Sequence, residues 1–201
     1  VMILRRRFRV AVLGMCGFAA GPGGIAAWLL RRPLMIHEAN AVCGLTNRLL
    51  APLSKRILTG FENVRYLGAK ARWTGNPVRT EITRRVSTPM AAQEIQLLRL
   101  LVLGGSQGAR SINELVPEAL RQSQCGTQLM ITHQCGQDRD GQVRRDYADA
   151  GISAQVVPYI EDMARAYRDA DLVIARSGAM TVTELSAAGP ASLLLPFPPA
   201  A

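Results

Sequence analysis

Residues 99–110 read R-L-L-V-L-G-G-S-Q-G-A-R, and residues 171–185 read D-L-V-I-A-R-S-G-A-M-T-V-T-E-L. In each stretch a short aliphatic run ends in small residues and opens into a helix-like pattern. Proteins of the α/β class use this strand, turn and helix to aim backbone N–H groups at a phosphate. Two such turns in one half of a chain predict a nucleotide site.

The rest of the chain alternates in the same way between strand-like and helix-like segments. We predict strands at 10–13, 34–37, 56–59, 72–74, 100–103, 128–132, 154–157, 172–175 and 192–195, and helices at 25–32, 45–53, 111–122, 138–150, 162–169 and 182–188. Strict alternation predicts right-handed crossovers and parallel sheets. We therefore expect a Rossmann-like domain at 98–201, the later part of another at 1–79, and a polar linker at 80–97.

Charge is spread unevenly along the 201 residues. Residues 1–100 carry 16 Arg or Lys against 4 Asp or Glu, whereas residues 101–201 carry 8 against 11. The net charge of +9 therefore belongs to the first half. Such asymmetry indicates a basic region that faces polyanions, whether nucleic acid, anionic lipid or a phosphorylated substrate.

Cysteine and histidine do not form a metal-binding pattern. The four cysteines contain no C-x-x-C pair, and His133 with Cys135 supplies too few ligands. We expect reduced thiols in a cytoplasmic protein and no metal site.

One uncharged stretch, residues 10–30, is long enough to span a membrane. Its glycines and Pro22 argue against a span, because they divide it into a strand, a glycine loop reaching Gly24 and a short apolar helix. We expect that helix to pack on a sheet.

The first glycine turn, Gly104 to Gly108, allows close backbone approach to a diphosphate, and Ser106 adds a hydroxyl. The alternative is a tight turn without a ligand, and the G-K-[ST] of a Walker loop is absent. In the second turn Glu184 could accept both ribose hydroxyls. However, Thr181 and Glu184 also fit a capping box, which only satisfies a helix start. Arg176 could neutralise a phosphate or be a solvated charge.

Two further polar groups follow strand ends. H-E-A-N at 37–40 could orient a sugar or form a satisfied turn, and G-N-P-V-R at 75–79 ends in Arg79, which suits a pyrophosphate. An exposed Arg in a Pro-bounded loop is the alternative for Arg79.

Six stretches, in order along nearly the whole chain, carry a resemblance to a known family. They are V-L-G-M-C-G-F-A-A-G-P-G-G (12–24), H-E-A-N-A-V-C-G-L-T-N-R (37–48), G-N-P-V-R (75–79), L-G-G-S-Q-G-A-R-S-I-N (103–113), Y-I-E-D-M-A-R-A-Y (159–167) and R-S-G-A-M-T-V-T-E-L-S-A-A-G (176–189). With these stretches the chain resembles the MurG family of bacterial N-acetylglucosaminyltransferases. Cys16 stands where the family has glycine, and Ala39 where it usually has Gln.

The resemblance implies an α/β fold of GT-B type, with two Rossmann-like domains that are both incomplete here. It also implies inverting transfer of N-acetylglucosamine from UDP-N-acetylglucosamine to the 4-hydroxyl of undecaprenyl-diphosphate-linked muramoyl-pentapeptide, without a metal ion or other cofactor. The family's donor-binding residues fall on Asn40, Arg79, Ser106, Ile160, Ala179, Met180, Thr181, Val182, Thr183 and Glu184. In that assignment Ser106 holds the diphosphate, Ile160 lies near the uracil and Glu184 binds the ribose.

The resemblance implies, further, that the chain begins after the family's T-G-G-H loop and stops before its H-Q-x-x-N-A motif. We expect weak binding of UDP-sugar and no detectable transfer, and the sequence does not identify the general base. The basic first half is expected to meet anionic lipid at the cytoplasmic face of the inner membrane, and the alternative is a solvated positive surface. The residues expected to do so are Arg5, Arg6, Arg7, Arg9, Arg31 and Arg32, beside the apolar Leu4, Phe8, Trp28 and Leu29. Another GT-B enzyme, such as a lipid glycosyltransferase or a UDP-sugar epimerase, is one alternative. A basic fragment that binds nucleic acid is disfavoured because few residues are aromatic.

Overall fold

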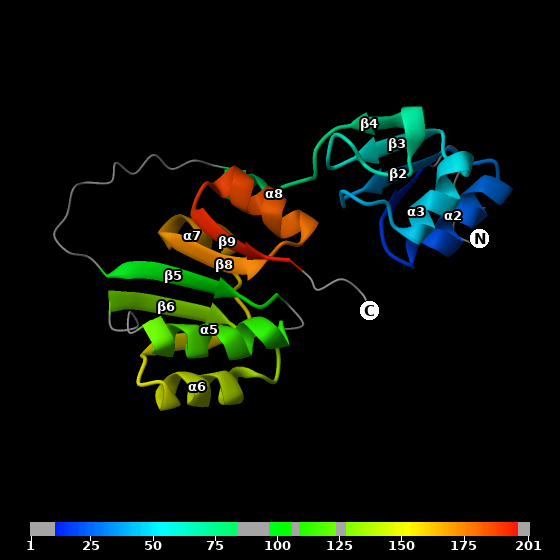
Figure 1. Cartoon of the computed structure of the whole chain (residues 1–201). Helices are drawn as coiled ribbons and strands as arrows, with labels where there is room; N and C mark the ends of the chain where they lie inside the picture. Colours follow the sequence, from blue (N-terminus) through cyan, green and yellow to red (C-terminus); the bar gives the residue numbers. More distant parts are fainter. Residues whose placement is uncertain (1–10, 84–96, 106–108, 124–127, 197–201) are drawn as a thin grey trace. The chain divides into compact units, whose positions relative to one another are not determined.

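The structure is a computed structural model that describes residues 11–83, 97–105, 109–123 and 128–196. The chain divides into two compact units, a first unit at 1–77 and a second unit at 78–201. Figure 1 shows that each unit is built on its own sheet. The predicted α/β class with two parallel sheets is therefore confirmed.

The first unit contains a four-stranded parallel sheet in the order β1-β2-β3-β4. Its strands are β1 (Val12–Met15), β2 (Leu34–Glu38), β3 (Arg56–Thr59) and β4 (Ala71–Trp73). Its helices are α2 (Ala20–Leu29) and α3 (Leu45–Leu50), and two 3₁₀ turns, η1 (Ala51–Leu53) and η2 (Gly68–Lys70), complete it.

Helices α2 and α3 pack closely against each other over this sheet. A Cβ atom at Gly24 would lie 2.7 Å from the side chain of Leu50, so glycine allows this close approach and a larger residue would force Leu50 to shift. The prediction of a glycine loop as far as Gly24 is wrong, because α2 already begins at Ala20. Pro22 is tolerated there, since the N–H groups of a first helical turn have no partner to lose.

The second unit contains a five-stranded parallel sheet in the order β7-β6-β5-β8-β9. Its strands are β5 (Leu98–Leu103), β6 (Leu129–Gln134), β7 (Ala154–Val157), β8 (Leu172–Arg176) and β9 (Ala191–Leu195). Counted within the unit this order is 3-2-1-4-5, which is the Rossmann arrangement. The order reverses between β5 and β8.

Helices cover both faces of the second sheet (Figure 1). They are α5 (Arg110–Ser123) and α6 (Asp140–Asp149) on one face, and α7 (Met163–Asp169) and α8 (Ala179–Ala188) on the other. Alternate residues of β5 serve the two faces: Leu100 and Val102 join the core under α5 and α6, and Leu101 and Leu103 join the core under α7 and α8.

The predicted linker at 80–97 is wrong in its first residues. Thr80–Thr83 forms a short helix, α4, whose Ile82 is buried in the core under α7 and α8. Residues 84–96 lie outside the described residues. The boundary between the units falls after Pro77, so Arg79 belongs to the second unit.

Residues 11–30 form β1, a turn and α2. Among the helices of the described residues, none combines the length and the apolar content that crossing a bilayer requires.

Candidate functional site

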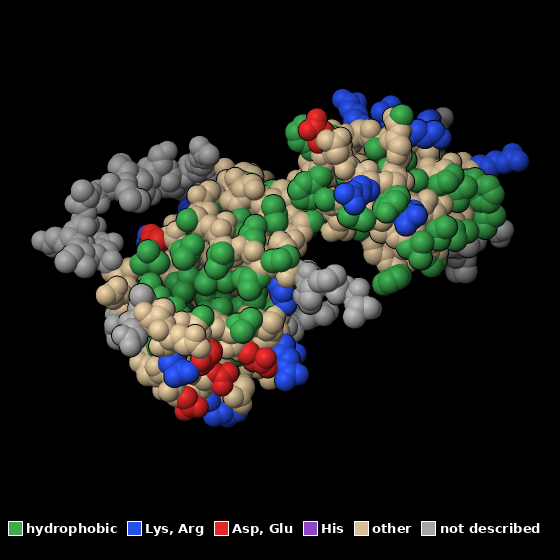
Figure 2. All heavy atoms as spheres, viewed as in Figure 1, with side chains coloured by type: hydrophobic (Ala, Val, Ile, Leu, Met, Phe, Trp, Pro, Cys, Tyr) green, Lys and Arg blue, Asp and Glu red, His purple; other side chains and the backbone are tan. Residues whose placement is uncertain are grey.

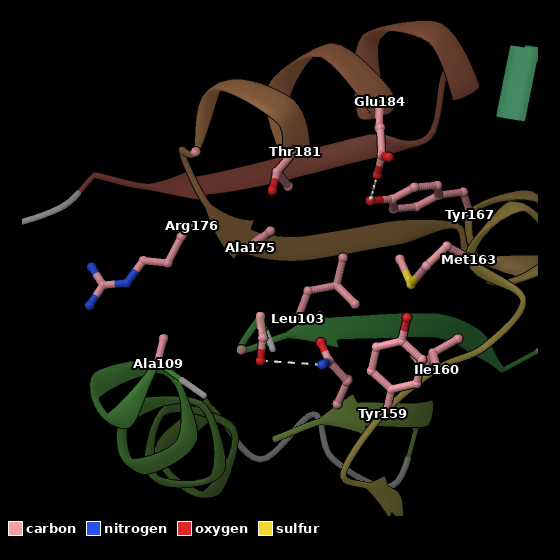
Figure 3. A pocket seen from close by; sticks show the side chains of 14 residues that line it. Leu103, Ala109, Tyr159, Ile160, Met163, Tyr167, Ala175, Arg176, Thr181 and Glu184 are labelled. Atoms are coloured by element: carbon pink, nitrogen blue, oxygen red, sulfur yellow. Dashed lines mark hydrogen bonds between the residues drawn. The ribbon is translucent and has the colours of Figure 1, made fainter. Parts of the chain in front are cut away.

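A cavity of about 520 Å³ opens at the carboxyl edge of the second sheet. Leu103 and Ala175, at the ends of β5 and β8, form part of its wall, so it lies where the strand order reverses. Open α/β sheets bind their ligands at this position. The lining residues, ten of them labelled in Figure 3, are Leu103, Gly104, Gly105, Ala109, Gln134, Tyr159, Ile160, Met163, Tyr167, Ala175, Arg176, Gly178, Thr181 and Glu184.

The amino-terminal ends of two helices reach this cavity. Ala109 directly precedes α5, and Gly178 is the N-cap of α8, whose first turn contributes Thr181. The first N–H groups of a helix have no partner within it, and the helix dipole adds partial positive charge there. Two such ends at one cavity favour an anion such as a diphosphate.

The glycine turn after β5 requires glycine at two positions. A Cβ atom at Gly104 would lie 2.9 Å from the carbonyl oxygen of Gln134, and Gly105 has a φ of +75°. Side chains rarely adopt that backbone conformation. The turn can therefore bring its backbone to the cavity only with glycine there, as the sequence predicts. Ser106, the predicted diphosphate ligand, lies outside the described residues.

Glu184 is the acidic side chain among the described residues of the cavity wall, and its carboxylate has two donors. Figure 3 shows the bond from Tyr167. The Tyr167 hydroxyl donates to Oε2 at 3.1 Å, and Nη2 of Arg79 lies 3.3 Å from Oε1. Burial and the neighbouring carboxylate raise the pKa of Tyr167, so this hydroxyl stays a donor at neutral pH. The capping-box alternative is wrong, because α8 begins at Ala179 and its N-cap is Gly178.

Arg176 joins three chain segments at the cavity. Nη1 donates to the carbonyl of Pro196 at 2.8 Å, just after β9, and Nη2 is hydrogen-bonded to the Ser111 hydroxyl in the first turn of α5. The guanidinium therefore combines structural bonds with a positive charge in the cavity wall.

A buried polar network joins α5 and α6 to the end of β6. His133 is fully buried and contacts the Tyr147 hydroxyl at 3.0 Å and Asn113 Oδ1 at 3.1 Å. Asn113 Nδ2 donates to the carbonyl of Cys135 at 2.9 Å, which ties α5 to the end of β6. Burial lowers the pKa of His133 to about 4, so the ring is neutral at neutral pH.

A second group of polar side chains lies at the carboxyl edge of the first sheet. His37 and Glu38 are the last residues of β2, not a turn beyond it, and both are buried. Glu38 accepts hydrogen bonds from the backbone N–H groups of Asn40 and Gly44 and from the side-chain amides of Asn40 and Asn47, at 2.9 to 3.1 Å. Burial raises the pKa of Glu38, but these bonds outweigh it and the pKa is lowered.

The structure brings together part of the predicted donor site. Ile160, Thr181 and Glu184 line the cavity, and Arg79 pairs with Glu184. Ala179, Met180, Val182 and Thr183 belong to the same helix without lining the cavity. Asn40 lies in the first unit, where its side-chain amide donates a hydrogen bond to Glu38.

Sequence analysis missed Tyr159, Met163 and Tyr167 as cavity residues. All three lie within Y-I-E-D-M-A-R-A-Y, and Met163 and Tyr167 are four residues apart on α7, which places them on one helix face. This spacing could have predicted that Met163 and Tyr167 lie side by side on the same face of α7.

Within the described residues, no group of three or more His, Cys, Asp or Glu side chains could hold a metal ion.

Comparison with known proteins agrees with this geometry. The model of the glycosyltransferase family 28 C-terminal domain matches residues 99–201, and that of the N-terminal domain matches residues 1–59. The chain belongs to glycosyltransferase family 28. The C-terminal match covers the sheet that forms the cavity except for Leu98, the first residue of β5.

Individual known proteins are similar over nearly the whole chain. The chain is 50% identical over 196 residues to the UDP-N-acetylglucosamine--N-acetylmuramyl-(pentapeptide) pyrophosphoryl-undecaprenol N-acetylglucosamine transferase of Nitrosococcus oceani, covering 97% of this chain and 55% of that one. It is 52% identical to the enzyme of the same name from Halorhodospira halophila, covering 97% and 54%. The crystal structure of Acinetobacter baumannii MurG matches with a TM-score of 0.76 at 40% identity, covering 99% and 55%. The chain spans about half the length of these relatives.

Proposed function

We propose that the chain is part of an inverting glycosyltransferase that moves N-acetylglucosamine from UDP-N-acetylglucosamine to the 4-hydroxyl of lipid-linked muramoyl-pentapeptide in peptidoglycan synthesis. The observation that carries the proposal is the cavity at the carboxyl ends of β5 and β8, which is lined by two helix starts and by the Glu184 carboxylate. The names of its relatives in family 28 support the same donor and acceptor.

We propose one orientation of the donor nucleotide in the cavity. The diphosphate would lie over the starts of α5 and α8, with the turn at Gly104 and Gly105 beneath it. The uracil would pack against the apolar wall at Ile160, and the ribose hydroxyls would donate to Glu184. Arg176 would add positive charge near the diphosphate.

The reaction needs most stabilisation at the diphosphate end of this site. The acceptor oxygen forms a bond to the anomeric carbon as the bond from that carbon to the diphosphate breaks, and the acceptor proton passes to a base. Negative charge grows on the leaving UDP in the transition state. The fixed N–H groups of the two helix starts would stabilise this charge more than they stabilise the bound donor.

Titration calorimetry with UDP-N-acetylglucosamine tests the donor assignment. We expect measurable but weak binding that UDP competes away and that ADP, with its larger base, does not. Equal binding of ADP and UDP would favour a general anion site, and no heat with either uridine nucleotide would overturn the proposal.

We propose, in addition, that the first unit binds an anionic membrane surface at the cytoplasmic face, as a peripheral protein. α2 exposes Ile25, Trp28 and Leu29 at helical spacing, and the neighbouring α3 exposes Leu45 and Leu49. Arg31, Arg32 and Arg48 lie in or just after these helices. Figure 2 shows hydrophobic and basic side chains together over this part of the first unit. Exposed apolar groups beside arginines suit the lipid interface.

Vesicle flotation tests the membrane surface. The chain should float with vesicles rich in anionic lipid and less with neutral ones, and replacing Trp28 and Leu29 by Ser should reduce flotation. Leu115→Ser, at an exposed leucine of α5, is the matched control and should change nothing. Equal flotation of all variants would contradict this surface.

A further inference from the structure

The Glu184 carboxylate has two partners of very different rigidity. Tyr167 is 3% exposed, and its ring is packed in the core of the second unit with Leu103 and Leu185. The Arg79 side chain is 53% exposed. An exposed ion pair holds a long side chain only weakly, because solvent screens it and both groups lose rotamer freedom. The hydroxyl of Tyr167 is therefore the fixed point to which Glu184 is attached.

This attachment leaves acceptor capacity toward the cavity. An ionised carboxylate can accept about four hydrogen bonds, and among the described residues Glu184 has one donor on each oxygen. The Glu184 side chain is 17% exposed and lines the cavity. Each oxygen can thus accept one more hydrogen bond from a ligand, which matches a pair of neighbouring hydroxyls.

We propose that Tyr167 is a positioning residue that holds Glu184 for the two ribose hydroxyls of a uridine nucleotide and so sets a preference for ribose over 2′-deoxyribose. This inference rests on the proposed function. A carboxylate fixed in place rejects a sugar that lacks one hydroxyl, because one of its oxygens then loses both water and ligand. A carboxylate free to rotate can adjust to the remaining hydroxyl and discriminates less.

Binding of UDP and 2′-deoxy-UDP to the Tyr167→Phe variant tests the proposal by calorimetry. The substitution keeps the ring and removes only the hydroxyl, and thermal melting checks that the second unit stays folded. Wild type should prefer UDP by roughly tenfold or more, as expected for a lost hydrogen bond to a charged group. Tyr167→Phe should reduce that ratio by roughly fivefold.

Tyr147→Phe is the matched control. Tyr147 is equally buried in the same unit, and its hydroxyl contacts His133 rather than the cavity. This variant should keep the wild-type ratio. If Tyr167 has only a structural role, its variant will lose affinity for both nucleotides equally, and an unchanged ratio overturns the inference.

A double substitution separates action through Glu184 from any other effect of Tyr167. Glu184→Ala should abolish most of the preference for UDP, and adding Tyr167→Phe should then change the ratio no further. A further loss in the double variant would contradict the proposal. If wild type binds neither nucleotide, the proposed function fails as well. If wild type prefers UDP and Tyr167→Phe keeps the same ratio, only this inference fails.

Discussion

Each unit places a glutamate at the carboxyl edge of its sheet, and the two glutamates differ in how their charge is satisfied. Glu38 is 1% exposed and accepts four N–H hydrogen bonds from its own chain. Glu184 faces a cavity and accepts from one hydroxyl and one guanidinium. A carboxylate saturated by its own chain organises a loop, whereas one with spare acceptor capacity can bind a ligand.

The same distinction explains why the family resemblance alone does not assign roles. Glu38 and Glu184 both lie in quoted motifs, but the bonds to Glu38 fix the chain from Asn40 to Asn47. Cys16 takes part in this arrangement: its thiol donates to the His37 carbonyl at 2.9 Å, and its φ is +56°. A positive φ at this position accounts for the glycine in the family pattern.

Glu38→Gln should have the largest effect, on stability rather than on binding. The new amide group would face N–H donors, and we expect the free energy of unfolding of the first unit to fall by about 3 kcal/mol. Both tryptophans, Trp28 and Trp73, lie in this unit, so fluorescence in a urea titration reports it. Glu62→Gln, at an exposed acid of the same unit, is the control and should change stability by less than about 0.5 kcal/mol. Equal effects would remove the contrast between the two glutamates.

Lowering the pH should destabilise the second unit before the first unit. The pKa of His133 is about 4 in the folded second unit against an ordinary 6.5, so the unfolded chain binds the proton first. Stability of that unit is then complete above about pH 6.5 and falls by up to about 3 kcal/mol as the pH approaches 4. The pKa of Glu38 is lowered from 4.5, so its contribution is lost only below that value.

Circular dichroism and tryptophan fluorescence, recorded together in denaturant at several pH values, separate the two transitions. Nuclear magnetic resonance of the His133 ring provides the direct check, and a titration midpoint near 6.5 would show that the ring is not held neutral.

Glu184→Ala should weaken UDP binding and leave stability almost unchanged, which is the opposite of Glu38→Gln. Its loss removes the acceptor for the ribose hydroxyls, and we expect UDP affinity to fall roughly thirtyfold, in line with hydrogen bonds to a charged group. Stability of the second unit should change little, because the site is open to water. Glu161→Ala removes an exposed acid beside Ile160 and serves as the control in calorimetry. If the Glu184→Ala variant is strongly destabilised but binds UDP normally, Glu184 has a structural role and does not bind the ribose.

Asp171→Asn gives the smallest expected effect. Asp171 is satisfied by its own chain, because Arg99 donates to it through its backbone N–H and its guanidinium at 2.8 to 3.1 Å. It directly precedes β8, at the edge of the sheet opposite the cavity. Both side chains are more than a third exposed, so the loss should be about 0.5 kcal/mol in a denaturant titration. UDP affinity should stay unchanged, and a tenfold loss would contradict the assignment of binding to the cavity edge.

Sequence patterns predicted the strands well, because buried parallel strands are short aliphatic runs between turns. β3 and β7 have the predicted bounds. Patterns failed where tertiary contacts override local preference. Gly21 to Gly24 read as a loop but lie in a helix, in which Gly24 lies close to Leu50 of α3. Thr80 to Thr83 read as a linker but form a helix that buries Ile82.

The site was predictable only in part, because a motif identifies residues but not the bonds they make. The turn at Gly104 and the acid at Glu184 were found from local sequence. The bond from Tyr167 to Glu184 was not, since it joins two helices that the crossover connections bring together. The choice between a cap and a ligand at Glu184 likewise depended on where α8 begins.

Nuclear magnetic resonance of the labelled chain during a UDP titration tests the central claim most directly. The account predicts backbone amide shifts that cluster at Gly104, Gly105, Ile160 and Thr181, with those of Asn40 and Gly44 beside Glu38 unchanged. Shifts that cluster around Glu38 instead, or no shifts at any of these amides, would contradict it.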